Sequence, residues 1–176
     1  MRGDLSYVGH LRGYHDINEA TNVDLGVSYA RGHNAAGVID DVDVGRFVTG
    51  VWGLDATVRW RPLQRAIYHS FVGRSEVLWS RREQIGGPQR SMGFFVSGDY
   101  QFARRWFTGV RYDRSDHADD AALQDTGQSF LVTYWPSEFS QIRSQYRRTK
   151  YAIGPTANEV LFQFQFSIGA HGAHPF

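Results

Sequence analysis

The sequence predicts an all-β fold, an antiparallel up-and-down β-barrel of which about nine strands lie in this chain. Three observations predict it. Apolar residues recur at every second position, short and long connections alternate between the segments, and aromatic residues gather near the ends of the apolar runs. A period of two is the mark of a strand with two different faces, and it does not fit the 3.6-residue period of a helix.

We expect nine strands, of which the last is the clearest. Val160, Phe162, Phe164 and Phe166 share one phase of this segment, and Gln163 and its neighbours Leu161 and Gln165 occupy the other. In chain order the expected strands lie near 5–14, 23–30, 48–60, 71–80, 94–102, 106–113, 130–134, 141–147 and 160–170.

The connections indicate two different ends of the sheet. Short links are expected near 15–21, 61–66, 103–105 and 135–138, and longer polar links near 31–43, 81–91, 114–127 and 148–157. The longer links carry turn residues such as Asp40-Asp41 and Gly86-Gly87-Pro88. Short turns at one end and longer loops at the other are typical of barrels that cross the bacterial outer membrane.

Composition agrees with a membrane strand rather than a membrane helix. The mean hydropathy is −0.43 and no stretch approaches the roughly 18 apolar residues of a membrane helix. A membrane barrel is polar on average, because half of each strand faces water. Aromatic residues make up 15% of the chain, and amphipathic rings favour the membrane–water boundary. The side chains expected to face the lipid bilayer include Trp52, Leu54, Phe94, Val96, Phe162, Phe164 and Phe166.

The opposite phase is polar and is expected to line the lumen. The predicted pore-lining residues are Arg12, Arg59, Arg74, Glu76, Asp99, Arg111, Asp113, Arg143, Gln163 and Gln165. Arg147, Asp24 and Asp55 share this phase, and the near balance of charges predicts no strong ion preference. Two interpretations stay open: a pore lining that screens solutes by charge and size, or a hydrated wall held by cross-strand ion pairs.

Other kinds of site have little support. The 19 basic and 18 acidic residues give no basic excess for nucleic acid, and the absence of cysteine excludes disulfides and thiolate metal sites. His171 and His174, or the Asp116-His117 loop, are too sparse to predict a metal site, so we expect no metal and no cofactor. His69 and Ser70 are adjacent, so they point to opposite faces of a strand and cannot act as a base and a nucleophile. We therefore expect no enzyme activity.

The ending of the chain carries a resemblance. An alternating last strand followed by a terminal aromatic residue, Phe176, resembles the assembly signal of Gram-negative outer-membrane β-barrels. The segment from Phe164 to Phe176 is similar to porin-like barrels labelled zinc-regulated TonB-dependent outer-membrane receptors. The resemblance implies the bacterial outer membrane as the location and insertion by the barrel assembly machinery through the last strand.

The expected function is a porin-like channel for passive or weakly selective diffusion of small solutes, and a homo-oligomer is compatible with it. Three alternatives stay open: the barrel part of a TonB-dependent receptor for a metal or metal complex, an adhesion or binding barrel plugged by its own side chains, and a lipocalin-like or sandwich fold whose apolar faces point inwards. We expect residues 1–176 to be the C-terminal part of one barrel domain, with further strands and a signal peptide upstream. A single-chain bacterial barrel has an even number of strands, so nine strands alone should form an open, curved sheet or an over-tight closure of the first strand against the last.

Overall fold

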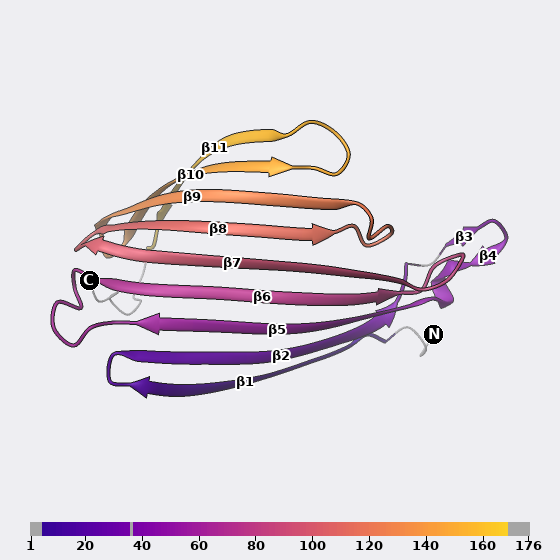
Figure 1. Cartoon of the computed structure of the whole chain (residues 1–176), viewed down its shortest axis with the longest axis horizontal. Helices are drawn as coiled ribbons and strands as arrows, with labels where there is room; N and C mark the ends of the chain where they lie inside the picture. The colour runs from indigo at the N-terminus through magenta and orange to yellow at the C-terminus, as the bar shows by residue number, and fades with distance from the viewer. Residues whose placement is uncertain (1–4, 36, 169–176) are drawn as a thin grey trace.

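The computed structural model describes residues 5–35 and 37–168 and contains one large antiparallel sheet (Figure 1). Nine strands follow in the order β1-β2-β5-β6-β7-β8-β9-β10-β11, and each pairs with the next along the chain. The strands are β1 (Tyr7–Asn18), β2 (Thr21–His33), β5 (Val48–Trp60), β6 (Ser70–Arg82), β7 (Gln89–Ala103), β8 (Trp106–Asp116), β9 (Gln124–Ser137), β10 (Ser140–Lys150) and β11 (Ala157–Phe166). The expected all-β, up-and-down arrangement of nine strands is confirmed.

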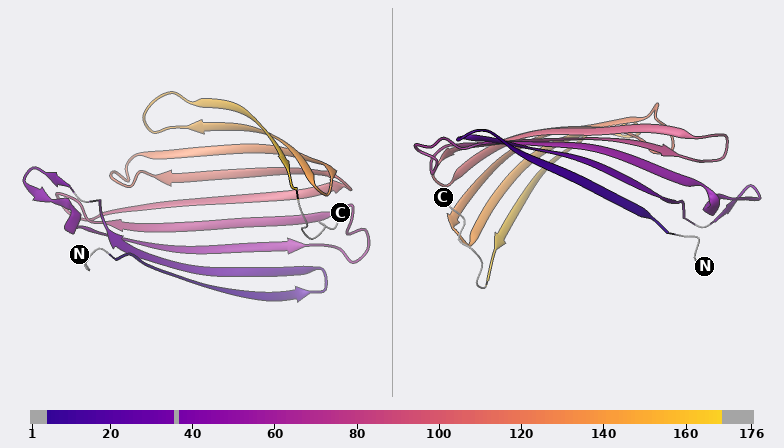
Figure 2. Two further views of the ribbon diagram at one scale, coloured as in Figure 1. Left: turned by 180° about the vertical axis from the view of Figure 1, so that it is seen from behind. Right: turned by 90° about the horizontal axis from the view of Figure 1, so that it is seen from below.

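The sheet is open rather than closed into a barrel. β1 pairs only with β2 and β11 pairs only with β10, so these two strands are its edges. Figure 2 shows the nine strands as a single twisted and curved layer, with no second layer against either face among the described residues. An open, curved sheet is one of the two forms expected for this chain.

The boundaries of the strands differ from those expected. The connections at one end are residues 19–20, 61–69, 104–105 and 138–139, and those at the other end are 34–47, 83–88, 117–123 and 151–156. Segment 61–69 is longer than the short link expected at 61–66, because a turn in which the Tyr68 and His69 amides donate to the Arg65 carbonyl precedes β6. The loops at the other end mostly begin later and end earlier than expected, since the hydrogen-bonded ladder continues past the last apolar residue.

One connection contains structure of its own. β3 (Val38–Ile39) and β4 (Val42–Asp43) form a small hairpin, followed by the short 3-10 helix η1 (Val44–Arg46). Asp40 and Asp41 both have positive φ, 48° and 61°, which is the backbone conformation of a two-residue hairpin turn. The alternation did not predict this hairpin, because two-residue strands are too short to show a period.

The sheet has no hydrophobic core. None of the hydrophobic side chains of the described residues is buried, whereas five polar ones are: Asp24, Gln101, Ser129, Thr133 and Gln141. A single layer cannot bury apolar groups against itself, so every apolar side chain keeps an open side. Within residues 5–35 and 37–168, no helix is long and apolar enough to cross a membrane.

The most buried of these polar side chains joins two connections at one end of the sheet. The Gln101 amide nitrogen donates to the carbonyls of Ile67 at 3.0 Å and Arg104 at 3.2 Å, and its oxygen accepts from the Ser70 hydroxyl at 2.9 Å. Gln101 is only 4% exposed. Its hydrogen bonds therefore fix the long connection 61–69 against the tight turn at 104–105.

Replacement of Gln101 by alanine should lower the free energy of unfolding by about 1–3 kcal/mol, because two carbonyls and one hydroxyl lose their partner in a buried position. Urea unfolding measures the loss. Gln64→Ala, an exposed change in the same connection, is the control and should have little effect. Equal stability of the two variants would contradict the structural role of Gln101.

Candidate functional site

The register of the sheet separates its residues into two faces. Residues that pair directly in an antiparallel sheet lie on the same face. One row crosses the sheet as Arg12, Gly26, Asp55 and Glu76, and it continues through Phe95 and Asp113. The neighbouring row passes through Thr57, Arg74, Ser97, Arg111, Ser129 and Arg147. We call the face that carries these rows the polar face, and the opposite one the apolar face.

All ten predicted pore-lining residues lie on the polar face. The strand registers place seven of them in three adjacent rows. The first row contains Arg12, Glu76 and Asp113, and the second contains Arg74 and Arg111. The third row contains Arg59 and Asp99. Arg143 pairs with Gln163, and Gln165 pairs with Gln141, at the β10–β11 end of the same face. The structure thus brings the ten residues onto one surface.

Five arginine–carboxylate pairs cross this surface. Arg74 Nη1 lies 2.7 Å from Asp99 Oδ2, Arg111 Nη2 lies 2.6 Å from Asp113 Oδ1, and Arg147 Nε lies 2.8 Å from Glu159 Oε2. Arg12 pairs with Asp55 at 3.1 Å, and Arg59 pairs with Asp24. Apart from the buried Asp24, the charges in these pairs are partly exposed, so the net stabilisation from each exposed pair is small, about 0–1 kcal/mol. The pairs nevertheless fix where each charge stands.

Two charged residues of the predicted set have no partner of opposite charge among the described residues. Arg143 donates from Nε to the Thr133 hydroxyl at 3.1 Å, which leaves its positive charge uncompensated. Glu76 makes no ion pair or hydrogen bond with any described residue, although it lies between Asp55 and Phe95 in the register. The charges of these two side chains are therefore not neutralised by the described part of the chain.

Glycine makes two of the ion pairs possible. Arg12 on β1 reaches Asp55 on β5 across the intervening β2, where Gly26 presents no side chain. A Cβ on Gly26 would lie 2.0 Å from Asp55 Oδ2. In the same way, a Cβ on Gly109 would lie 2.5 Å from Asp99 Oδ1, the carboxylate that binds Arg74. From the sequence, these glycines were predicted only to belong to the polar phase of their strands. Their small size among charged residues of that phase was the feature that could have indicated space for an ion pair.

An aromatic side chain also belongs to the polar face. The guanidinium carbon of Arg111 lies 3.9 Å from the centroid of the Phe95 ring, which is within the range of a cation–π interaction. The same guanidinium pairs with Asp113, so it is held from two sides. Two contacts therefore orient Arg111, and Phe95 shows that the polar face is not uniformly polar.

The apolar face carries two rows of aromatic residues. Tyr29, Trp52 and Trp79 pair in one row, and Trp60, Phe71 and Tyr100 pair in the other. The Tyr29 and Trp52 ring centroids are 4.4 Å apart. Between the two rows β5 presents Leu54, Ala56 and Val58. The apolar side chains on this face are widely exposed: Trp52 is 55% exposed and Phe162 is 79% exposed.

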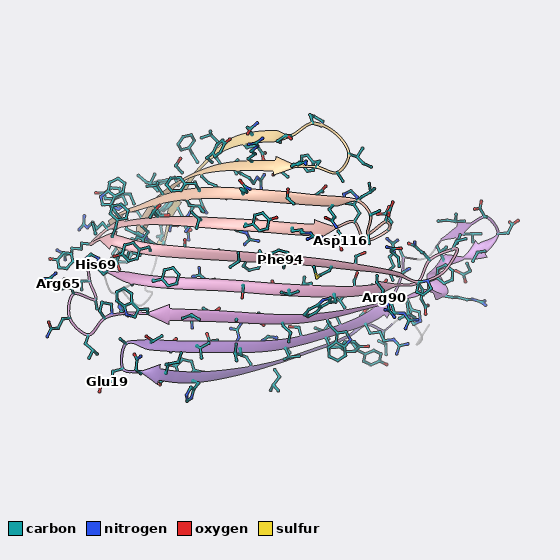
Figure 3. All side chains as sticks on the ribbon, in the orientation of Figure 1. Glu19, Arg65, His69, Arg90, Phe94 and Asp116 are labelled. Atoms are coloured by element: carbon teal, nitrogen blue, oxygen red, sulfur yellow. The ribbon has the colours of Figure 1, made fainter. Side chains whose placement is uncertain are left out.

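All seven residues expected to face lipid lie on this apolar face: Trp52, Leu54, Phe94, Val96, Phe162, Phe164 and Phe166. Figure 3 shows Phe94 part of the way along β7, between Arg90 at the end near the long loops and the opposite end of the sheet. The predicted assembly signal, Phe176, and the two terminal histidines, His171 and His174, lie outside the described residues.

A hydrogen-bond cluster joins two of the long loops. Asp125 Oδ1 accepts from the Ala152 amide at 2.8 Å and lies 3.2 Å from His117 Nε2. Asp125 stands at the loop end of β9, beyond the apolar run that begins at Phe130. The Ala152 amide, followed by His117, lowers the pKa of this carboxyl below its usual value. No group of three His, Asp or Glu side chains in the described ranges is arranged to hold a metal ion.

The adjacent residues His69 and Ser70 have different partners. His69 Nδ1 lies 3.2 Å from the Tyr100 hydroxyl on the apolar face, and Ser70 donates to Gln101 on the polar face. The two side chains therefore point to opposite faces of the sheet, as the sequence predicted.

A comparison with known proteins finds a similar protein of Aquifex aeolicus (strain VF5), described as an uncharacterized protein. It is 30% identical over 196 residues, an alignment that covers 97% of this chain and 40% of the Aquifex protein. The chain therefore spans about 40% of the length of this relative. No family model and no solved structure matches the chain.

The fit between Gly109 and Asp99 can be measured by a double-mutant cycle. Gly109→Ala should destabilise the natural protein, because the new methyl group displaces the carboxylate that binds Arg74. In an Asp99→Ala background the same change should be nearly neutral. The two changes should therefore couple by about 0.5–3 kcal/mol in urea unfolding.

The matched control is Gly13→Ala, where a Cβ meets no atom within 4 Å. It should not couple to Asp99→Ala. Additive effects of Gly109→Ala and Asp99→Ala would mean that Gly109 does not make room for the ion pair.

Proposed function

We propose that this chain forms part of the wall of an outer-membrane β-barrel that serves as a channel for small solutes. The observation that carries the proposal is a sheet one layer thick, with an uncovered apolar face and a polar face crossed by ion pairs. Such a sheet suits a wall between hydrocarbon and water. A lipid bilayer covers the apolar face in this account, and the polar face lines a water-filled lumen.

The spacing of the aromatic rows supports a bilayer as the partner of the apolar face. Trp52 and Trp60 stand eight residues apart on β5, which is about 27 Å along a strand that rises about 3.4 Å per residue. With a tilt of about 40°, the rows stand about 20 Å apart along the membrane normal, close to the roughly 25 Å apolar band of outer-membrane barrels.

A large hollow also lies on the apolar face. A groove of about 960 Å³ runs over β7 to β10 and is lined mainly by outward side chains, among them Val96, Val110 and Phe130. Arg148 and Gln128 also reach the groove, but most of its exposed lining is apolar. A hydrocarbon chain fits this lining, and the groove supports lipid contact rather than catalysis.

The open edges determine how the wall must be completed. In hydrocarbon each unpaired backbone group costs several kcal/mol, so β1 and β11 need strand partners there. We propose that further strands of the same polypeptide pair with both edges. The matched region makes up 40% of the Aquifex relative, which leaves ample chain in that protein for further strands. In this account the barrel assembly machinery inserts the protein, with β11 as the last described strand.

The lipid-facing assignment predicts different costs for charge on two adjacent residues of β7. Val96→Arg places a charge on the apolar face near its middle and should cost about 2–4 kcal/mol of stability in vesicles. Ser97→Arg is the matched control, because it puts the same side chain on the polar face. Arg74 and Arg111 flank this position, but each like-charge contact costs only about 0.2–1 kcal/mol, so the total cost should stay below that of Val96→Arg. Urea unfolding of both variants makes the comparison. Equal costs would contradict the assignment of the two faces.

The lumen assignment predicts a change in ion selectivity. Arg74→Glu and Arg111→Glu each exchange a cation for an anion and leave Asp99 or Asp113 without its partner, so the channel should shift towards cations in planar-bilayer recordings. Arg148→Glu, the same charge change on the apolar face of β10, is the control and should leave selectivity nearly constant. An unchanged reversal potential in both test variants would contradict a lumen lined by this face.

A further inference from the structure

Three arginines gather on the apolar face, where a membrane-facing surface should have few charges. Arg31 on β2 pairs with Gly50 on β5, Gly50 pairs with Arg81 on β6, and Arg81 pairs with Arg90 on β7. The four residues form one row across four neighbouring strands. This arginine row lies two residues further towards the long loops than the row of Tyr29, Trp52 and Trp79. Figure 3 shows Arg90 at that end of the sheet.

The row surrounds a hollow. Its volume is about 580 Å³, and its lining includes all three arginines, Trp52 and Trp79. Gly50 stands at the centre, and a Cβ at this position would meet no atom within 4 Å. Adjacent strands lie about 4.8 Å apart, so Arg31 and Arg81 flank the glycine at about that distance on each side. The result is an open, positively charged notch with an indole wall on the side of the apolar band.

The arginines are not neutralised by the protein. None of the three makes an ion pair with a carboxylate of the described residues. Arg81 and Arg90 are direct cross-strand neighbours, and like charges in that position destabilise a sheet. An anion bound between Arg81 and Arg90 would remove this repulsion. On the polar face, by contrast, five arginines already pair with carboxylates of the protein.

Two carboxylates also line the hollow, but backbone amides already bind them. Glu83 Oε2 accepts from the Val48 amide at 2.9 Å, and Asp116 Oδ2 accepts from the Met92 amide at 3.0 Å. The other Asp116 oxygen is buried and has no hydrogen-bond partner in the described part of the chain.

We propose that this notch binds the phosphate of an anionic membrane lipid, one whose headgroup carries no compensating cation, with the acyl chains lying along Trp52 and Trp79. Guanidinium groups match phosphate in shape and charge and bind it through paired hydrogen bonds. A headgroup beside an apolar band places the phosphate at the level of the arginine row and the hydrocarbon at the level of the indoles. The proposal rests on the proposed function, because it needs lipid against the apolar face.

The test uses the full-length gene product folded into phosphatidylcholine vesicles. Trp60→Phe, Trp106→Phe and Trp135→Phe leave Trp52 and Trp79 as the tryptophans of this region, and any tryptophan elsewhere in the gene product is replaced in the same way. Bromine atoms on lipid chains quench tryptophan fluorescence at contact. Brominated phosphatidic acid, titrated against brominated phosphatidylcholine, should bind beside these indoles about fivefold to tenfold more tightly.

Substitution of all three arginines by glutamine should abolish that preference. Substitution of all three by lysine should keep most of it, because the charge remains. Arg104→Gln, an exposed cation in the turn at the other end of the sheet, is the matched control and should keep the full preference. Circular dichroism verifies that each variant is folded.

Several results would overturn the proposal. Equal quenching by the two brominated lipids in the natural protein would show that the notch does not select an anionic phosphate headgroup over a zwitterionic one. A preference that survives the glutamine triple variant would place the lipid site elsewhere. If brominated phosphatidylcholine itself fails to quench Trp52 and Trp79, the apolar face does not meet lipid, and the proposed function fails together with the site.

Discussion

The uncovered apolar face is the constraint on which the rest of the structure depends. An apolar side chain left in water forgoes about 1.5–3 kcal/mol of burial, and folded proteins are stable by only about 5–15 kcal/mol in total. A sheet with exposed Leu25, Val110, Phe130 and Phe162 therefore exceeds that margin within a few residues. The fold needs something apolar against this face. A bilayer meets the need along the whole width of the sheet and requires no groove of matching shape.

The same constraint accounts for the polar face. Backbone hydrogen bonds hold the strands together, so the side chains of the polar face need not form a core, and they form cross-strand pairs instead. Carboxylates such as Asp55 and Asp99 occupy the space that Gly26 and Gly109 leave open. The charges then stand at fixed places, with Arg111 held between Phe95 and Asp113. In this account a wall of paired charges gives water a continuous path, and Glu76 and Arg143 supply the charge that is not cancelled.

Much of the fold could be predicted because a period of two is a local signal. The alternation of apolar and polar residues along the chain indicates on which face of the sheet a side chain lies, as it does for Trp52, Leu54, Arg74 and Gln163. The strand order also follows from the chain, since short links favour neighbouring antiparallel strands. What could not be predicted depends on register. The pairing of Arg12 with Asp55 across Gly26 joins residues 43 positions apart, and no local pattern encodes that offset. The arginine row cannot be predicted from the sequence for the same reason. That Arg31, Arg81 and Arg90 are neighbours follows only from the registers of three strand pairs.

The central claim is that the apolar face meets lipid, and accessibility of spin labels tests it most directly. The chain contains no cysteine, so single cysteines can be introduced at Phe94, Ser97, Phe162 and Gln163 and labelled with a nitroxide in the vesicle-inserted protein. The account predicts that oxygen, which is concentrated in hydrocarbon, broadens the signals at Phe94 and Phe162, whereas a water-soluble nickel chelate broadens those at Ser97 and Gln163. Signals at Phe94 and Phe162 that neither reagent reaches would place these residues in a packed protein interior and contradict the account.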